Sequence, residues 1–286
     1  MIIGHVVEVW RYPVKSMGGE SLPRASFGAF GIPGDRGWAL RDEDAGEVRG
    51  AKKLPALMQC AARYDAEPAD GRIPPVTMTL PDGATLRSGD ADAAVRLSAL
   101  TGRRVTLWPL QPPERAEHYR RGLPDDPDME AELRQIFGRL PDEPLPDLST
   151  LPPELFEYTS PLGTYFDLLP VHLLTTASLR ALAAKNPAAR FDVRRFRPNV
   201  LIEPGAAVNG LIETDWCGRS LRVGGAVFAI AMPTMRCSMT AQATADLPKD
   251  PSVLRTIVRD ANQNLGVYAT VQQVGDVEIG DQVEII

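Results

Sequence analysis

VYATVQQVGDVEIGDQVEII, residues 267–286, alternates apolar and polar residues around the turn-forming Gly275 and Gly280-Asp281. Such alternation is typical of half-buried antiparallel strands joined by tight turns. Repeated strand–helix–strand units, which would build a parallel sheet, are not the pattern here. We therefore predict an α+β, β-rich fold in which a barrel-like β domain carries a few helices.

The first half of the chain also contains strand-like stretches. Strand-like stretches at residues 76–80 and 84–86 flank Pro81-Asp82-Gly83, a turn signal that predicts a hairpin. Residues 91–100 are predicted as a helix, with Ser88 or Asp90 as its cap and Gly102 just past its end. We place the domains at 1–118 and 119–286, with a proline-rich linker at about 139–161.

Three further helices are expected in the second domain, and one of them is a short helix at about residues 177–185. Met129, Leu133, Ile136 and Phe137 fall on one helical face, and Gly138 is the stop signal. Asp250-Pro251 begins the third helix, because an aspartate can cap it and a proline is tolerated at its first position.

The composition excludes several classes of protein. The 286 residues include 31 Lys and Arg against 37 Asp and Glu, a formal net charge of -6, so no overall basic surface exists for nucleic acid or an anionic membrane. Any anion must bind in a local pocket. The N-terminus lacks the pattern of an export signal and no stretch is long and apolar enough to span a membrane, which predicts a cytoplasmic protein.

The three cysteines Cys60, Cys217 and Cys237 lie far apart and form no CxxC pair. Structural zinc sites and iron–sulfur clusters usually need four closely spaced ligands, so neither is expected. The sequence also lacks the GxGxxG, P-loop, HExxH and GxSxG motifs. The histidines are isolated, and we interpret them as structural.

Two basic stretches are candidates for binding an anion. The first joins Lys15-Ser16, just after a proline-broken strand, with Arg36 in GDRGW. The alternative for these residues is a solvated loop with a surface pair between Asp35 and Arg36. In the second, an extended conformation would place Arg195, Arg197 and Asn199 on one face, and the alternative is that the arginines pair with the acidic surface.

A third stretch, Pro233–Thr240, places Cys237 directly after an apolar strand and among hydroxyl-bearing residues. A thiolate there could be stabilised and still be reached by a ligand. The alternative is that Cys237 is an inert packing residue, as we expect for Cys60 and Cys217.

Taken in order, the segments YPVKS, GDRGW, FDLLPVHLLTTASL, RFRPNVLIE, DWCGRSLRVG, PTMRC and VEIGDQVEII resemble the MOSC family with its N-terminal β-barrel domain. The family is named for the C-terminal domain of molybdenum cofactor sulfurases. It includes amidoxime-reducing enzymes and bacterial reductases of N-hydroxylated compounds. The resemblance covers nearly the whole chain.

The resemblance implies a molybdenum cofactor, Mo-molybdopterin, whose metal is bound by Cys237. It implies that Lys15, Ser16 and Arg36 hold the cofactor from the first domain. It also implies cofactor contacts from the second domain, at Thr176, Ser178, Arg197 and Asn199. Asp167 corresponds to an acidic position of the family, with a role in substrate binding or in structure left open.

The function that this resemblance implies is reduction of small N-oxygenated compounds. The chain ends at Ile286 without the ferredoxin domain that some bacterial relatives carry, so the expected electron donor is a separate ferredoxin- or flavin-type reductase. One alternative is a cofactor carrier or sulfur-relay module that acts through Cys237. A third hypothesis is a cofactor-free thiol enzyme that uses Cys237 with His172 or His118.

Overall fold

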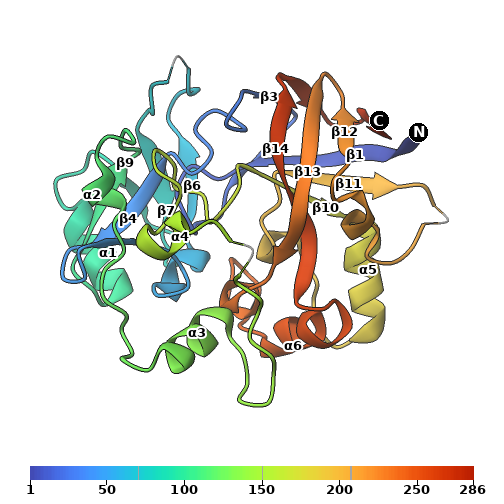
Figure 1. Cartoon of the computed structure of the whole chain (residues 1–286). Helices are drawn as coiled ribbons and strands as arrows, with labels where there is room; N and C mark the ends of the chain where they lie inside the picture. Colours follow the sequence, from blue (N-terminus) through green and yellow to red (C-terminus); the bar gives the residue numbers. More distant parts are fainter. Residues whose placement is uncertain (70, 150, 207) are drawn as a thin grey trace.

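Seven strands close into a barrel, which confirms the predicted fold class. The computed structural model describes residues 1–69, 71–149, 151–206 and 208–286. Around the barrel the strands follow the order β11 (Val200–Pro204), β10 (Val171–Thr175), β14 (Asn264–Gln273), β13 (Ala226–Met235), β12 (Ser220–Val223), β16 (Gln282–Ile285) and β1 (Ile2–Arg11). The N-terminal strand β1 closes the ring by pairing with β11 as well as β16 (Figure 1). Only the β10–β11 pair among these is parallel.

Alternate residues of these strands fill the barrel. On β14 and β16, Val267, Ala269, Val283 and Ile285 are buried, as the alternation of the C-terminal sequence predicts. Phe228 of β13 lies at the centre, with its ring edge-on to Phe27 at a centroid distance of 4.9 Å. The barrel therefore has its own closed apolar core.

The N-terminal part adds two three-stranded sheets. One contains β5 (Glu47–Arg49), β4 (Trp38–Asp42) and β9 (Val105–Pro109), and the other β6 (Ala61–Tyr64), β7 (Val76–Thr79) and β8 (Thr85–Arg87). The hairpin of β7 and β8 confirms the predicted turn. The 3-10 helix η1 (Pro55–Gln59) and helix α1 (Ala93–Thr101) complete this part, which has a separate apolar core.

The start of α1 differs from the prediction, while its end agrees. Asp92 occupies the cap position, whereas Ser88 accepts a hydrogen bond from the Val76 N–H and Asp90 from the Arg87 N–H. Both predicted caps are thus used by the preceding hairpin. Gly102 ends the helix with a left-handed backbone, as expected.

The N-terminal residues also contribute to the barrel side of the molecule. The short strand β2 (Glu20–Leu22) pairs with β1, and β3 (Arg24–Phe27) pairs with β15 (Gly275–Glu278). Strands from the first 27 residues therefore belong to the sheets of the C-terminal part. The domain boundary at residue 118 stays a prediction.

The segment between the two parts carries short helices. These are α2 (Ala116–Tyr119), α3 (Met129–Phe137) and α4 (Glu154–Glu157). Helix α3 ends at Gly138, as predicted, and a Cβ there would come within 2.8 Å of Leu254. Residue 150 of the predicted linker lies outside the described residues.

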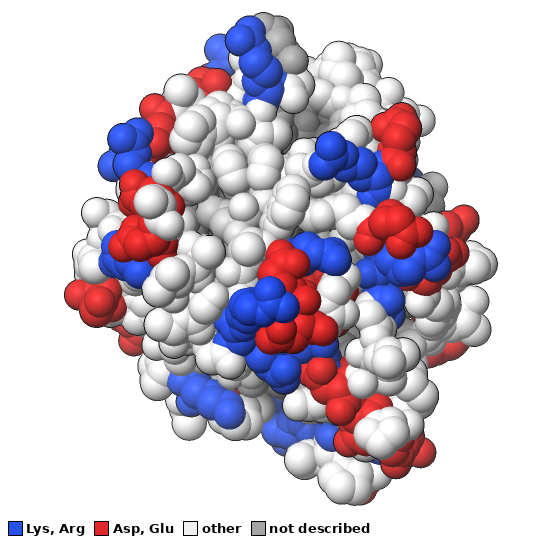
Figure 2. Space-filling model, turned by 90° about the vertical axis from the view of Figure 1, so that its left-hand side faces the viewer, with Lys and Arg blue, Asp and Glu red and all other residues white. Residues whose placement is uncertain are grey.

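Helices α5 (Thr176–Lys185) and α6 (Pro251–Asp260) pack beside the barrel, with Asp250 capping α6 as predicted. The 3-10 helices η2 (Val193–Arg195), η3 (Ile212–Trp216) and η4 (Ser238–Ala241) lie in its connections. On the face shown in Figure 2, basic and acidic side chains are interspersed rather than separated. Within the described ranges, no helix has the length and apolar character needed to cross a bilayer.

Replacing Phe228 by alanine tests whether the barrel core sets the stability of the protein. Loss of this fully buried ring should lower the free energy of unfolding by about 3–5 kcal/mol. The matched control, Phe30→Ala, removes a ring that is 77% exposed and should change it by less than about 0.5 kcal/mol. Urea denaturation of both variants measures the difference, and equal effects would contradict the assignment of the core.

Candidate functional site

A buried carboxylate, Asp35, joins the N-terminal loops to the barrel. Its two oxygens accept hydrogen bonds from the Tyr12 N–H at 2.8 Å and from the Asn199 side-chain amide at 2.9 Å. Asp35 also forms an ion pair with Arg36. Because Asn199 immediately precedes β11, this carboxylate fixes the loops around residues 12 and 36 against the barrel.

Three of the residues predicted to hold the cofactor share an unusual backbone conformation. Ser16, Arg36 and Arg197 have φ angles of 73°, 53° and 56°. Only three other non-glycine residues in the described part of the chain have a positive φ. Such conformations cost free energy and concentrate at functional sites, where the surrounding structure enforces them. Their grouping here marks this region as a site.

The arginines of these loops converge on one aromatic ring. The guanidinium carbons of Arg197 and Arg36 lie 4.1 Å and 4.7 Å from the centroid of Tyr12. Arg197 also donates to the carbonyl oxygen of Met17. Cation–π contact compensates part of the cost of burying two like charges near each other. Burial, with the charge of Arg36, lowers the pKa of Arg197 to about 10.

Lys15 and Ser16 are fixed by hydrogen bonds. Lys15 Nζ donates to the Tyr165 carbonyl at 2.8 Å and to Asp167 at 2.7 Å. Ser16 Oγ accepts from the Ala51 N–H at 2.8 Å. The role of Asp167 was left open between substrate binding and structure. In the structure Asp167 is the acidic partner of Lys15.

Cys237 lies where β13 gives way to η4, and its side chain is half-buried. The carbonyl oxygen of Cys237 accepts from Thr240 N and Thr240 Oγ1 at 3.3 Å and 3.1 Å. The carbonyl of Arg236, the preceding residue, accepts from Arg139 at 3.0 Å. The backbone on both sides of the thiol is therefore fixed, while the thiol lines a cavity.

Two adjoining cavities, of about 50 and 160 Å3, form what we call the cationic cleft. They share Arg36, Asp167, His172, Arg197, Met239 and Tyr268. Six basic residues line the cleft against a single acidic one, Asp167; the six are Lys15, Arg36, Lys52, Arg195, Arg197 and Arg236. Although the chain is acidic overall, this cleft concentrates positive charge, as a local binding site for an anion needs.

Lys52 and Asp167, which line the cavity of Cys237, shift each other's pKa. Burial acts to lower the pKa of Lys52, but the carboxylate of Asp167 raises it above its ordinary value. Burial acts to raise the pKa of Asp167, but Lys15 and Lys52 hold it well below its usual range. At neutral pH Lys52 therefore carries an ammonium group and Asp167 a carboxylate, and 3.4 Å separates Lys52 Nζ from Asp167 Oδ2. We call this pair the mouth of the cleft.

The predicted residues Lys15, Ser16, Arg36, Arg197, Asn199 and Cys237 all line the cleft. The extended conformation expected for the arginine stretch is wrong, because Val193–Arg195 is a 3-10 turn and Arg197 is left-handed. Arg195 consequently donates to the carbonyl oxygens of Arg190, Gln242 and Pro248. The Asn199 amide group is occupied by bonds within the protein.

Thr176 and Ser178 lie apart from the cleft. Thr176 donates to Glu203, and Ser178 donates at 2.5 Å to the buried carboxylate of Glu213. The acceptor beside the start of α5 is therefore the carboxyl group of Glu213. Thr175, the cap residue of α5, also donates to Glu213 at 3.0 Å.

Several residues of the cleft were not predicted as cofactor-binding, among them Lys52, Arg236 and Tyr268. Lys52 had no distinguishing signal in GEVRGAKK, and His172 was interpreted as structural except in the hypothesis of a thiol enzyme. His172 is buried in the cleft wall with its Nε2 unpaired. Burial and the nearby charge of Arg236 lower the pKa of His172 well below its ordinary value, so its ring is neutral. His118 instead contacts the Tyr165 hydroxyl at 2.7 Å.

These residues fit a metal that arrives with its own anionic carrier. Among the described residues, no group of three or more His, Cys, Asp and Glu could hold a bare metal ion. The cleft offers one thiol, six cations and two buried nitrogens without partners, His172 Nε2 and Arg236 Nε. A soft thiolate suits a high-valent metal already bound by sulfur, and the cations suit an organic phosphate.

Comparisons with known proteins agree with this description. The family model "MOSC N-terminal beta barrel domain" matches residues 3–113, and "MOSC domain" matches residues 165–284. A relative from Bos taurus, mitochondrial amidoxime reducing component 2, is 23% identical over 300 residues, covering 98% of this chain and 83% of the relative.

Two solved structures give similarities of lower degree. The YuaD protein of Bacillus subtilis aligns with a TM-score of 0.44 and 12% identity, covering 100% of this chain and 96% of that one. YiiM of Geobacillus stearothermophilus aligns with a TM-score of 0.33 and 20% identity, covering 41% of this chain and 54% of that one.

Replacing the two glutamates beside α5 by glutamine should have opposite effects on stability. Burial raises the pKa of Glu213 above its ordinary 4.5, so its ionised form destabilises the folded state. Glu213→Gln should therefore raise the free energy of unfolding at neutral pH, and this gain should vanish as the pH falls to about 4.5.

Glu203 provides the matched control. The hydrogen bond from Thr176 and the interaction with Arg180 hold its pKa below 4.5, so its ionised form is stabilising. Glu203→Gln should cost stability at neutral pH, and the cost should vanish as the pH falls below 4.5. Urea denaturation at several pH values measures both, and effects of the same sign would contradict the opposite pKa shifts of Glu213 and Glu203.

Proposed function

Because the chain belongs to the MOSC-domain family, we propose that it is a molybdenum cofactor-binding oxidoreductase that reduces N-oxygenated compounds. The observation that carries this proposal is the single thiol, Cys237, in a cleft lined by six basic residues. The printed name of the Bos taurus relative, an amidoxime reducing component, supports the substrate class.

The two parts of the chain would hold the cofactor together. We assign Cys237 to the metal, and Arg36 and Arg197 to the anionic part of the cofactor, since guanidinium groups form paired hydrogen bonds with phosphate. Lys15, Ser16 and Asn199 line the same cleft, but their polar groups are already hydrogen-bonded within the protein. We therefore assign these three residues to shaping the cleft.

When bound, the cofactor would supply two electrons, which with two protons convert an N–OH group into N–H and water, or an N-oxide into the amine and water. Lys52 remains protonated beside Asp167, so its ammonium group can donate a hydrogen bond to the substrate oxygen at the cleft mouth. Asp167 remains ionised and orients both Lys15 and Lys52. His172 is neutral and adds no charge.

The electrons must come from outside the chain, because neither an N-oxygenated compound nor these side chains can supply them. We propose a ferredoxin- or flavin-type reductase as the donor, and the cytoplasm as the location of the reaction.

Metal and pterin analysis of protein from a molybdenum-competent host tests the proposal. Cys237→Ala should lose most of its molybdenum, because the metal loses its only protein ligand. The control, Cys217→Ala, removes another half-buried thiol that does not line the cleft and should keep the wild-type content. Wild-type protein without molybdenum, or full retention in Cys237→Ala, would refute the assignment.

A reduced-dye assay on hydroxylamines, amidoximes and N-oxides then separates the enzyme from the alternative carrier. Turnover of any of these compounds supports the proposal. Release of the cofactor to an apo-enzyme without turnover supports a carrier or sulfur-relay module instead.

Replacing Lys52 by methionine tests its role at the cleft mouth. Loss of a hydrogen bond made in the transition state should lower kcat about a hundredfold. The molybdenum content should stay at the wild-type level, because Cys237 is unchanged. Lys52→Arg keeps the charge and should restore part of kcat, and an unchanged kcat in Lys52→Met would show that Lys52 is not involved.

A further inference from the structure

A larger cavity, of about 300 Å3, opens beside the cationic cleft. It lies between two parts of the chain. One is β5 with the following Lys52 and Lys53, and the other consists of residues 121–149 and 151–156. We call this cavity the apolar chamber, and its main apolar lining comes from Val48, Leu133, Ile136, Phe137, Leu151 and Leu155. Its volume is at the lower end of the range typical of small-molecule sites.

The apolar chamber adjoins the cleft. Lys15, Ser16, Asp167 and Met239 line both the chamber and the smaller cavity of the cleft. Lys52, Phe137 and Leu155 are among the residues that line both the chamber and the Cys237 cavity. A molecule in the chamber therefore lies against Lys52 and Asp167, which also line the cavity that contains Cys237.

Helix α3 turns its apolar face toward this space. Leu133, Ile136 and Phe137 are only half-buried, and none of them belongs to the four clusters of buried apolar side chains among the described residues. The most buried residue of the helix is instead an acid, Glu132. An amphipathic helix normally buries its apolar face in a core, so this face lacks its usual partner.

Glu132 is the polar part of the chamber lining. Its side chain is 5% exposed, and one oxygen pairs with Lys53 while the other, Oε2, has no partner among the described residues. A buried oxygen without a hydrogen bond costs free energy unless a donor reaches it. This atom therefore needs a donor such as an ordered water. An apolar occupant is indicated instead by the face of α3 and by the position of the chamber beside the cleft.

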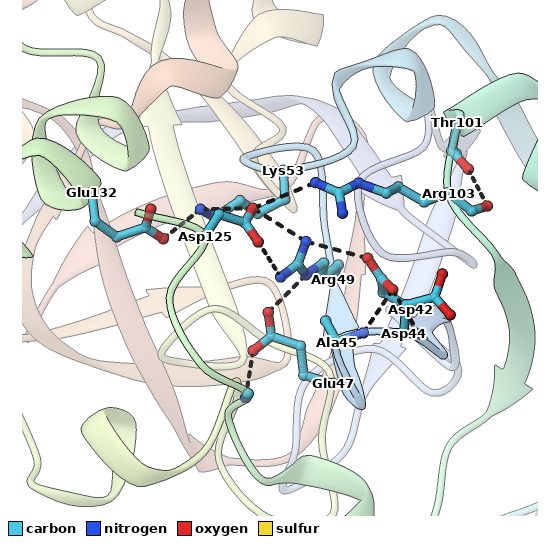
Figure 3. Close-up of polar contacts among 11 residues, drawn as sticks. Asp42, Asp44, Ala45, Glu47, Arg49, Lys53, Thr101, Arg103, Asp125 and Glu132 are labelled. Atoms are coloured by element: carbon cyan, nitrogen blue, oxygen red, sulfur yellow. Dashed lines mark hydrogen bonds and ion pairs between the residues drawn. The ribbon is translucent and has the colours of Figure 1, made fainter. Parts of the chain in front are cut away.

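Ion pairs hold the outer wall of the chamber in place. Asp125, just before α3, contacts Arg49 at 2.8 Å and Lys53 at 3.2 Å. Figure 3 shows Lys53 between Asp125 and Glu132, and Arg49 between Asp125 and Glu47. The chamber is thus a formed cavity whose wall is tied to the N-terminal part.

We propose that the apolar chamber binds the hydrophobic body of an N-oxygenated substrate and directs its polar end to the Lys52–Asp167 pair. This inference rests on the proposed function and narrows it to compounds with a long aliphatic or aromatic body. Small polar N-oxygenated compounds would gain nothing from the chamber.

Binding of two amidoximes tests this inference without turnover. Calorimetry on the full chain should show that octanamidoxime binds more tightly than acetamidoxime, by up to about fourfold for each methylene that the chamber buries. Leu133→Trp fills part of the chamber and should weaken octanamidoxime roughly tenfold, which corresponds to about two fewer buried methylenes. The affinity for acetamidoxime should stay unchanged in this variant.

Leu140→Trp is the matched control, because Leu140 is 50% exposed in the same segment and does not line the chamber. It should bind both amidoximes as the wild type does. Equal affinity for the two amidoximes, or equal loss in both variants, would overturn the inference. Failure of the proposed function would look different, since the dependence on chain length would persist in a protein that contains no molybdenum and reduces neither compound.

Discussion

The arrangement of the cleft depends on the buried carboxylate of Asp35. It binds the backbone of Tyr12, the guanidinium of Arg36 and the amide of Asn199, which come from three separate parts of the sequence. With Arg197 over the Tyr12 ring, these contacts bring two like charges together and enforce left-handed backbones at Arg36 and Arg197. A site that concentrates positive charge in this way is organised for an anion that the protein itself does not supply.

Much of the fold could be predicted because its signals are local. Asp250 and Pro251 mark the start of α6, Gly138 ends α3, and the alternation after Val267 defines β14. The part that β1 plays in closing the barrel could not be predicted. It depends on pairing between β1 and β11, about two hundred residues apart, whose register is set by packing rather than by any local pattern.

The site was predictable to the extent that its residues lie in recognisable motifs. Lys15, Ser16, Arg36, Arg197, Asn199 and Cys237 meet in one cleft, although the backbone around Arg197 is not the extended one expected. Thr176 and Ser178 were predicted to contact the cofactor at the start of a helix. The hydroxyl of Ser178 instead donates a hydrogen bond to Glu213, which is distant in sequence. Lys52 and the apolar chamber gave no signal, because their place depends on how residues 121–149 and 151–156 pack against β5 and the lysines after it.

We propose that both parts of the chain hold one cofactor whose metal binds Cys237. Anomalous diffraction at the molybdenum edge, from crystals of the cofactor-loaded protein, locates the metal without reference to activity. We expect one strong peak within bonding distance of Cys237 Sγ, in the cleft lined by Arg36, Arg197 and Lys52. A molybdenum peak elsewhere in the molecule, or no peak in protein that carries stoichiometric pterin, would contradict this proposal.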